Sequence, residues 1–177
     1  MGDVFMSLKE EITKAMQMLA EDERVIFLGQ NVCYPGHVVY ETLSGVPDEK
    51  KIELPVAEEM QMGISTGMAI CGFVPVSIYP RIDFLVLAMN QLVNHLDKLH
   101  EMSQGQLQPK VIVRTMIGNT SPLHPGPQHS QRHVPALRLL LKHTKVYEIE
   151  RAEDVLQTYE KALHQEGPVL VVEAAYR

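Results

Sequence analysis

The sequence predicts a three-layer α/β/α fold around a mainly parallel sheet of about six strands. Two observations support this prediction. Strand-like and helix-like segments alternate along the whole chain, and the strand-like segments are continuous apolar runs without polar alternation. Strands of this kind are buried on both faces, because helices cover both sides of a parallel sheet. We expect residues 1–177 to form a single domain.

A capping box made by Ser7 and Glu10 predicts a helix from about residue 7 to residue 20, with apolar residues at helical spacing. Glycine and proline mark the boundaries of the later elements. The further expected helices are 37–43, 58–71, 84–102, 135–142 and 152–165, and the long helix 84–102 carries Leu85, Met89, Leu92, Val93 and Leu96 on one face. The expected strands are 25–28, 52–54, 74–79, 111–113, 145–149 and 169–173.

Ligands of parallel sheets bind at the carboxyl ends of the strands, near a reversal in strand order. The loops that follow the strands are therefore where chemistry is expected. These loops are 29–36, 55–59, 80–84 and the long segment 115–132, which is rich in Gly, Pro, Ser, Asn and His.

Composition excludes several classes of protein. The net charge of −6 gives no basic surface for nucleic acid. No apolar run approaches the ~20 residues that span a bilayer. Cys33 and Cys71 do not form a disulfide framework, and we expect two reduced, mostly buried thiols. Residues 1–11 are polar and acidic, unlike a leader peptide, so we expect a reduced cytoplasm.

Glu58 and Glu59 begin a helix directly after a strand. The simple interpretation is that they compensate the helix dipole. The functional interpretation is a carboxylate held at the sheet edge for proton transfer. The segment Tyr79–Phe84 has two interpretations as well, as an aromatic stacking platform after a core strand or as a hydrophobic start to the next helix.

The long loop places His124, His129 and His133 within ten residues. A zinc site there lacks Cys, Asp or Glu ligands nearby, so a catalytic or partner-facing loop is the favoured interpretation. Ser130 beside His129 is not a triad signal. The sequence has no Gly-x-Gly-x-x-Gly, no P-loop and no Gly-Asp-Gly with a downstream Asn. We infer that any phosphate cradle lies on another chain.

An ordered set of segments resembles a known family, the pyrimidine-binding domain of thiamine diphosphate enzymes. It is similar to the N-terminal domain of 2-oxo acid dehydrogenase (decarboxylase component) beta subunits and to the transketolase middle domain. The resemblance covers about residues 7–175. It rests on Val25–Gly29, Leu54–Glu58, Gly63–Ala69, Gly72–Val76, Asp83-Phe84, Asn90–Asn94, Lys98, Met102–Gln106 and Gln128–Gln131.

The resemblance implies roles for five residues. Glu58 matches the glutamate that hydrogen-bonds the aminopyrimidine ring of the cofactor, and Phe84 matches the aromatic residue that stacks on that ring. Val56 and Pro80 match positions that line the pocket. His129 matches an active-site histidine near the substrate. Mg²⁺ and the diphosphate are expected on an alpha-type partner subunit, and no metal ligand is assigned to this chain.

The sequence departs from the family pattern in two places. Gln30 and Asn31 stand where beta subunits usually carry Glu and Asp, which puts a proton relay between paired active sites in doubt. The family's carboxy-terminal domain has no counterpart here, which favours a small biosynthetic enzyme over a large oxidative complex. Glu59 has no catalytic counterpart in the family and is interpreted as a helix-start charge.

We therefore expect the pyrimidine-binding subunit of a split thiamine diphosphate enzyme. Its reaction would be transketolase-like or of the 2-oxo acid decarboxylase/dehydrogenase type, on a sugar phosphate or a 2-oxo acid. The expected assembly is a homodimer or an α₂β₂ heterotetramer. Two alternatives stay open. One is a non-catalytic interaction subunit that retains the fold. The other is a metal-dependent enzyme built on the part of the long loop that carries His124, His129 and His133, called the histidine loop below.

Overall fold

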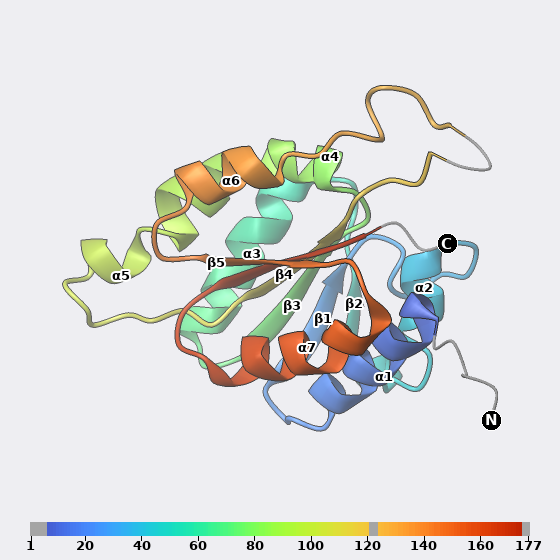
Figure 1. Ribbon diagram of the computed structural model, residues 1–177. Helices are drawn as coiled ribbons and strands as arrows, with labels where there is room; N and C mark the ends of the chain where they lie inside the picture. Colours follow the sequence, from blue (N-terminus) through green and yellow to red (C-terminus); the bar gives the residue numbers. More distant parts are fainter. Residues whose placement is uncertain (1–6, 121–123, 175–177) are drawn as a thin grey trace.

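The computed structural model describes residues 7–120 and 124–174. Its centre is a six-stranded sheet in which every pairing is parallel, with strand order β2-β1-β3-β4-β6-β5 (Figure 1). The predicted fold class is thus confirmed. The strands are β1 (Val25–Gly29), β2 (Lys51–Glu53), β3 (Val74–Tyr79), β4 (Ile112–Met116), β5 (Lys145–Ile149) and β6 (Val169–Glu173).

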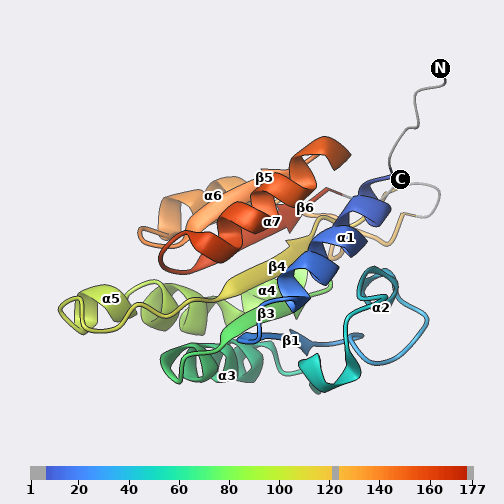
Figure 2. The ribbon, with the colours of Figure 1, turned by 90° about the horizontal axis from the view of Figure 1, so that it is seen from below.

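Helices cover both faces of the sheet (Figures 1 and 2). On one face lie α1 (Leu8–Ala20) and α7 (Val155–His164), which pack against each other. On the other lie α3 (Glu58–Ile70), α4 (Ile82–Leu85) and α6 (Val134–Leu140). Two separate clusters of buried apolar side chains fill the two sides of the sheet. This arrangement explains why the strands carry apolar residues at consecutive positions.

The predicted capping box begins α1. The Ser7 side chain accepts a hydrogen bond from the backbone N–H of Glu10, and the Glu10 carboxylate accepts one from the backbone N–H of Ser7. The apolar stripe of this helix is fully buried at Ile12, Met16 and Leu19. Both the start of the helix and the face that it buries therefore follow from local sequence.

The prediction of one helix over 84–102 is wrong. The segment consists of α4, a 3₁₀ turn at Val86–Ala88, a π-helical stretch at Asn90–Leu96 and α5 (Leu99–Met102). The backbone N–H of Asp97 bonds to the carbonyl of Leu92, five residues earlier, at 2.9 Å. The wide turn accompanies the burial of the Asp97 side chain, a tertiary contact that apolar periodicity does not encode.

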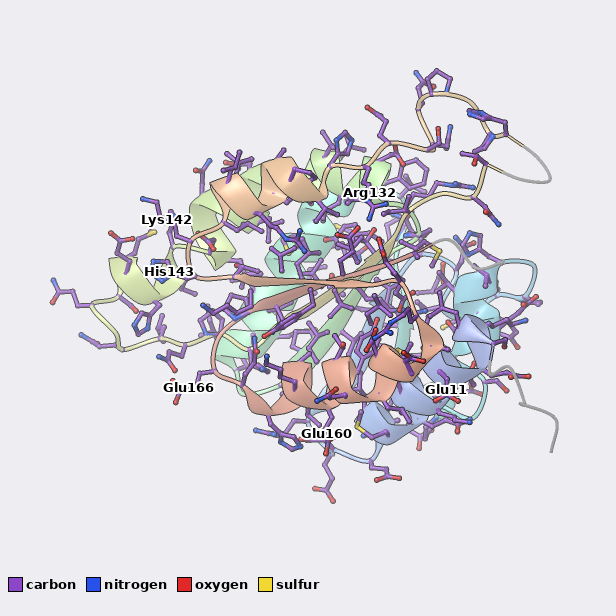
Figure 3. All side chains as sticks on the ribbon, in the orientation of Figure 1. Glu11, Arg132, Lys142, His143, Glu160 and Glu166 are labelled. Atoms are coloured by element: carbon purple, nitrogen blue, oxygen red, sulfur yellow. The ribbon has the colours of Figure 1, made fainter. Side chains whose placement is uncertain are left out.

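The buried carboxylate of Asp97 fixes the chain before β5. It accepts hydrogen bonds from the backbone N–H groups of Lys142 at 3.1 Å, His143 at 2.9 Å and Thr144 at 2.7 Å. Lys98 Nζ donates to it at 2.6 Å. Figure 3 shows Lys142 and His143 beside α5, at the opposite end of the sheet from Arg132.

Three further boundaries differ from expectation. β4 continues through Met116, two residues into the expected loop, because Arg114 and Thr115 are buried in the sheet. β2, an edge strand with an exposed Ile52, begins and ends one residue earlier than expected. A 3₁₀ turn at Ala152–Asp154 forms the start of the last expected helix.

α2 (Val38–Thr42) connects β1 to the sheet edge and contacts a buried ion pair. Arg114 of β4 donates to the Glu173 carboxylate of β6 at 2.8 Å, and both side chains are fully buried. Arg114 also donates to Thr42 Oγ1 at 3.0 Å, and Tyr159 donates to Glu173. The pair links the carboxyl ends of two central strands to helices on the α1 face.

The cysteine prediction was partly wrong. Both thiols are free, but Cys71 at the end of α3 is exposed, while Cys33 is half-buried. Cys71 lies in the turn that Gly72 completes at a φ of 94°, a backbone conformation typical of glycine after a helix.

Within the described residues, no helix is long and apolar enough to cross a bilayer.

Candidate functional site

The strand order reverses at β1. From β1 the chain proceeds to β2 on one side, and then crosses to β3 on the other side. Such a reversal opens a crevice at the carboxyl ends of the two strands that flank it, because the connecting helices leave on opposite faces of the sheet. The loops after β1 and β3, residues 30–37 and 80–81, therefore border the candidate site.

The loop after β1 is held by a carboxylate. Glu53, at the end of β2, accepts hydrogen bonds from the backbone N–H groups of Asn31 and Val32 at 2.8 Å, and from that of Cys33 at 2.9 Å. Asn31 adopts a positive φ of 60°, which Asn tolerates better than most residues. This arrangement fixes the direction of the loop that carries Gln30.

A hollow of about 440 Å³ lies between these loops and the histidine loop. Phe84 and His129 meet in it edge to face, with ring centroids 5.6 Å apart and ring planes at 87°. Its lining is Gln30, Asn31, His37, Pro80, Arg81, Phe84, Pro125 and His129. Residues from three loops far apart in the sequence thus share one space at the sheet edge.

Two contacts tie the histidine loop to the start of α4. Arg81 Nη1 donates to the carbonyl oxygen of His129 at 2.9 Å. The Asp83 carboxylate accepts from the backbone N–H of Gln131 at 3.2 Å and from its side-chain amide at 3.1 Å. The loop is therefore positioned mainly through its backbone.

Glu58 is the first residue of α3 and is only 5% exposed. The Tyr79 hydroxyl donates to its backbone carbonyl at 3.2 Å. Burial raises the pKa of Tyr79 well above its usual value, so this hydroxyl stays a donor. Within the described residues, no side chain or backbone group is hydrogen-bonded to the Glu58 carboxylate.

Glu58 borders a second hollow, of about 590 Å³ and open to the surface. Its lining is Ala57, Glu58, Glu59, Met60, Gly63, Leu87 and Gln91. Glu59 is exposed there and accepts a hydrogen bond from Asn90 Nδ2 at 3.2 Å. The two neighbouring glutamates thus differ sharply in burial and in their contacts.

The structure brings some of the predicted residues together and separates others. Phe84, Pro80 and His129 line the same hollow. Glu58 lines the other hollow, which shares no lining residue with the first, at the start of a helix that packs against the turn after α4. Val56 is 78% exposed in the loop before α3, and it lines neither hollow.

Sequence reasoning missed Arg81, His37 and Glu53. Arg81 and His37 stand in loops that follow strands, and Glu53 is the last residue of a strand. These positions were the only signal available in the sequence. Arg81 and Glu53 act through hydrogen bonds across 20 residues or more, such as the bond between Cys33 and Glu53, and local patterns do not reveal such bonds. His37 bonds locally to Val39, but only the fold places it beside Arg81.

The histidine loop forms no metal-binding group in the described part of the chain. No set of three or more His, Cys, Asp or Glu side chains is placed to hold an ion there. The two hollows carry other features: the buried residue Glu58 borders one of them, and the Phe84 ring lines the other.

The comparison with protein families decides the assignment. The model described as "Transketolase, pyrimidine binding domain" matches residues 6–175, nearly the whole chain. The chain belongs to this family. The resemblance stated from the ordered sequence segments is thereby confirmed.

This pyrimidine-binding domain is similar to several beta subunits of the pyruvate dehydrogenase E1 component. It is 25% identical over 180 residues to the mitochondrial subunit of Caenorhabditis elegans, covering 95% of this chain and 48% of that one. It is 33% identical over 132 residues to the subunit of Gracilaria tenuistipitata var. liui, covering 73% and 39%. The domain thus spans about half the length of these relatives, or less.

A solved structure with the same fold is titled "Split gene transketolase, inactive beta4 tetramer". It superposes with a TM-score of 0.75 at 17% identity, over 97% of this chain and 52% of that one. At this identity the likeness concerns the fold alone.

Enzymes of this family depend on thiamine diphosphate. The pyrimidine-binding domain fits one half of that cofactor. The Glu58 carboxylate accepts no hydrogen bond from the described residues and borders an open hollow. The Phe84 ring lines the hollow at the end of β3. Within the described residues no acidic cluster is arranged to hold Mg²⁺.

Proposed function

We propose that this chain is the pyrimidine-binding subunit of a split thiamine diphosphate-dependent enzyme, acting with a separate alpha-type subunit that binds the diphosphate and Mg²⁺. The observation that carries the proposal is the Glu58 carboxylate. It is buried at a helix start, borders an open hollow and accepts no hydrogen bond from the described residues. A carboxylate that borders an open hollow and has no donor within the described residues can accept a hydrogen bond from a ligand or a partner.

Three residues of this chain have roles in the proposal. Glu58 accepts a hydrogen bond from the pyrimidine ring and exchanges a proton there. Phe84 stacks on the ring. His129, held edge to face by Phe84, donates to or accepts from a polar group of the substrate. The bound cofactor supplies the stabilisation of a carbanion, and the protein supplies orientation and the proton partner.

The surface around Glu58 supports an obligate partner. The helix and turn beside the hollow expose large apolar side chains to solvent, and such patches mark interaction sites. They are Val56, Met60, Ile64, Val86 and Leu87. We propose that the partner covers this face in an α₂β₂ heterotetramer, and that the chain alone forms a homodimer.

The reaction is proposed at the level that the site supports. It is either transketolase-like ketol transfer or processing of a 2-oxo acid of the decarboxylase/dehydrogenase type. The substrate is accordingly a sugar phosphate or a 2-oxo acid. We propose a cytoplasmic location, in keeping with two cysteines that are both free thiols.

The test uses the chain with its partner, recovered by affinity purification from native cells. Glu58→Gln should lower thiamine diphosphate-dependent activity about 10²-fold or more, because the proton partner is lost. Glu59→Gln is the matched control and should keep activity within about twofold, since the dipole compensation is equal at both positions. A Glu58→Gln pair with full activity would remove the proposal.

A non-catalytic subunit is the second candidate. Gln30 and Asn31, which replace the usual carboxylates at the end of β1, favour it. Calorimetry on the purified pair separates the two functions. Thiamine diphosphate that binds the partner equally with and without this chain would support the non-catalytic role.

A further inference from the structure

We propose that the hollow between the β1 and β3 loops binds the anionic group of the substrate, with Arg81 as the cation and His37 and Gln30 as hydrogen-bond donors. The group is a carboxylate or a phosphate. Both carry negative charge and several acceptor oxygens, which are planar in the carboxylate and tetrahedral in the phosphate. The inference rests on the proposed function, since it assigns a substrate contact beside Phe84 and His129.

Arg81 differs from the other arginines of the described chain. Arg24, Arg114, Arg132, Arg138 and Arg151 each have a carboxylate within ion-pair distance. Arg81 is half-buried and donates to the His129 carbonyl, but no carboxylate of the described residues lies within ion-pair distance of it. A guanidinium has five donors, and the bond to His129 uses one of them.

His37 contributes a donor in a fixed orientation. Its Nδ1 accepts a hydrogen bond from the backbone N–H of Val39 at 3.1 Å, as the N-cap of α2. The proton of the neutral ring therefore resides on Nε2. Burial lowers the pKa of His37, and the positive charge of Arg81 lowers it further. The imidazole is thus a neutral donor in a positive field.

Gln30 supplies the second donor. Its side chain is 8% exposed and borders the hollow, and its Nε2 has no hydrogen-bond partner within the described residues. A Glu at this position would bring a negative charge to the same hollow. The departure from the usual carboxylate therefore makes the hollow more favourable to an anion.

The nearby described carboxylates form no ion pair with Arg81. Glu41, whose charge acts on His37, is paired with Lys9. The Oδ1 atom of Asp83 is bonded to Gln131, and its buried Oδ2 atom has no partner among the described residues. A smaller hollow of about 250 Å³ shares His37, Pro80 and Arg81 and continues to Gly118 and Asn119. Arg81 thus stands where the two hollows meet, with room for an anion on either side.

The experiment titrates inorganic phosphate and, separately, pyruvate into the full chain, and follows the ring resonances of His37 and His129 by NMR. The variants are Arg81→Gln, Arg81→Lys and His37→Gln. Arg151→Gln is the matched control, because Arg151 is exposed and paired with Glu153 and Asp154. Circular dichroism and melting curves confirm that each variant is folded.

We expect saturable shifts at His37, with a dissociation constant that rises about tenfold or more in Arg81→Gln and stays unchanged in Arg151→Gln. Arg81→Lys should lie between them, since it keeps the charge and loses the fork. If Arg81→Gln does not fold, the dissociation constants of His37→Gln and Arg151→Gln are compared instead, both read from the ring resonances of His129, and a rise in His37→Gln alone is expected.

Binding of phosphate alone supports a sugar phosphate, and binding of pyruvate alone supports a 2-oxo acid. Absence of shifts with both anions overturns the inference, as does equal affinity in Arg81→Gln and Arg151→Gln. The proposed function fails separately: an active pair carrying Glu58→Gln would remove it, while anion binding through Arg81 would stand.

Discussion

Glu53, the last residue of β2, and Asn31, in the loop after β1, are joined by a 2.8 Å hydrogen bond from the Asn31 backbone N–H to the Glu53 carboxylate. Val32 and Cys33 bond to the same carboxylate. An edge strand thus fixes the loop that forms one wall of the anion-binding hollow. The family resemblance identified Gln30 and Asn31 in this loop as replacements for the usual carboxylates. The structure shows in addition that Glu53 holds the loop in place.

Substitution of Glu53 by Gln should loosen this loop. Glutamine has one acceptor oxygen in place of a charged carboxylate that serves three N–H groups, so we expect a loss of about 1–3 kcal/mol in unfolding free energy. Urea denaturation of the chain measures it. Glu49→Gln, on the exposed turn before β2, is the control and should be neutral. Equal midpoints for the two variants would contradict this role of Glu53.

Gly118 leaves room for the contact between Arg81 and the histidine loop. A Cβ at this position would overlap with the His129 carbonyl oxygen and with Arg81 Nη1. Gly118→Ala should therefore break that hydrogen bond and destabilise the chain by about 1–3 kcal/mol, as overpacking does. Thermal denaturation checks the prediction.

Gly67→Ala is the matched control for Gly118→Ala. Gly67 lies inside α3, and a Cβ there meets no atom within 4 Å. Alanine is the better helix former, so this variant should be neutral or stabilised by up to about 1 kcal/mol. A similar loss in both alanine variants would contradict the steric argument.

The buried pair of Arg114 and Glu173 should respond strongly to the loss of one partner. Glu173→Leu leaves the Arg114 charge in the core, at an expected cost of about 3–5 kcal/mol. The double variant Arg114→Met with Glu173→Leu should recover much of that loss, because it buries no charge. Equilibrium urea unfolding gives both values. A double variant that is less stable than the single one would refute this account.

Acid should weaken the anchor at Asp97. Burial alone would raise the pKa of Asp97, but the Lys98 ammonium and the backbone N–H groups of Thr144 and Lys142 outweigh it and hold the pKa at about 2. A carboxyl whose pKa is lower in the folded state contributes stability above its ordinary pKa, and loses it as the pH falls toward the folded value.

Between about pH 4 and pH 2, the unfolding free energy of the wild type should therefore fall more steeply than that of Asp97→Asn. The amide carries no proton to gain, so its curve is flatter in this window while its stability near neutral pH is lower. Denaturant titrations at several pH values supply both curves. Parallel curves would show that Asp97 does not contribute to the acid sensitivity.

Local signals in the sequence predicted much of the fold. Apolar runs predicted β1, β3 and β6, and a capping box predicted the start of α1. Both signals consist of residues that are close together in the sequence. The expected helix 84–102 was wrong because its course depends on Asp97 reaching the chain before β5.

The site was less accessible to sequence reasoning. The end of β4 was missed because Arg114 is buried in an ion pair with Glu173, 59 residues later. Phe84 and His129 were expected at the site from the family resemblance, but their edge-to-face contact required the fold. For Arg81 the sequence offered only its position in the loop after a strand. That it has no carboxylate partner is seen only once the fold places its neighbours.

The histidine loop is attached to the start of α4 through the carbonyl of His129 and the amide groups of Gln131. The carbonyl is present whatever side chain stands at position 129. The imidazole can therefore be exchanged while Arg81 keeps its bond to the loop. Residue 129 is thus a position where the chemistry offered to a substrate can be re-engineered with the scaffold left intact.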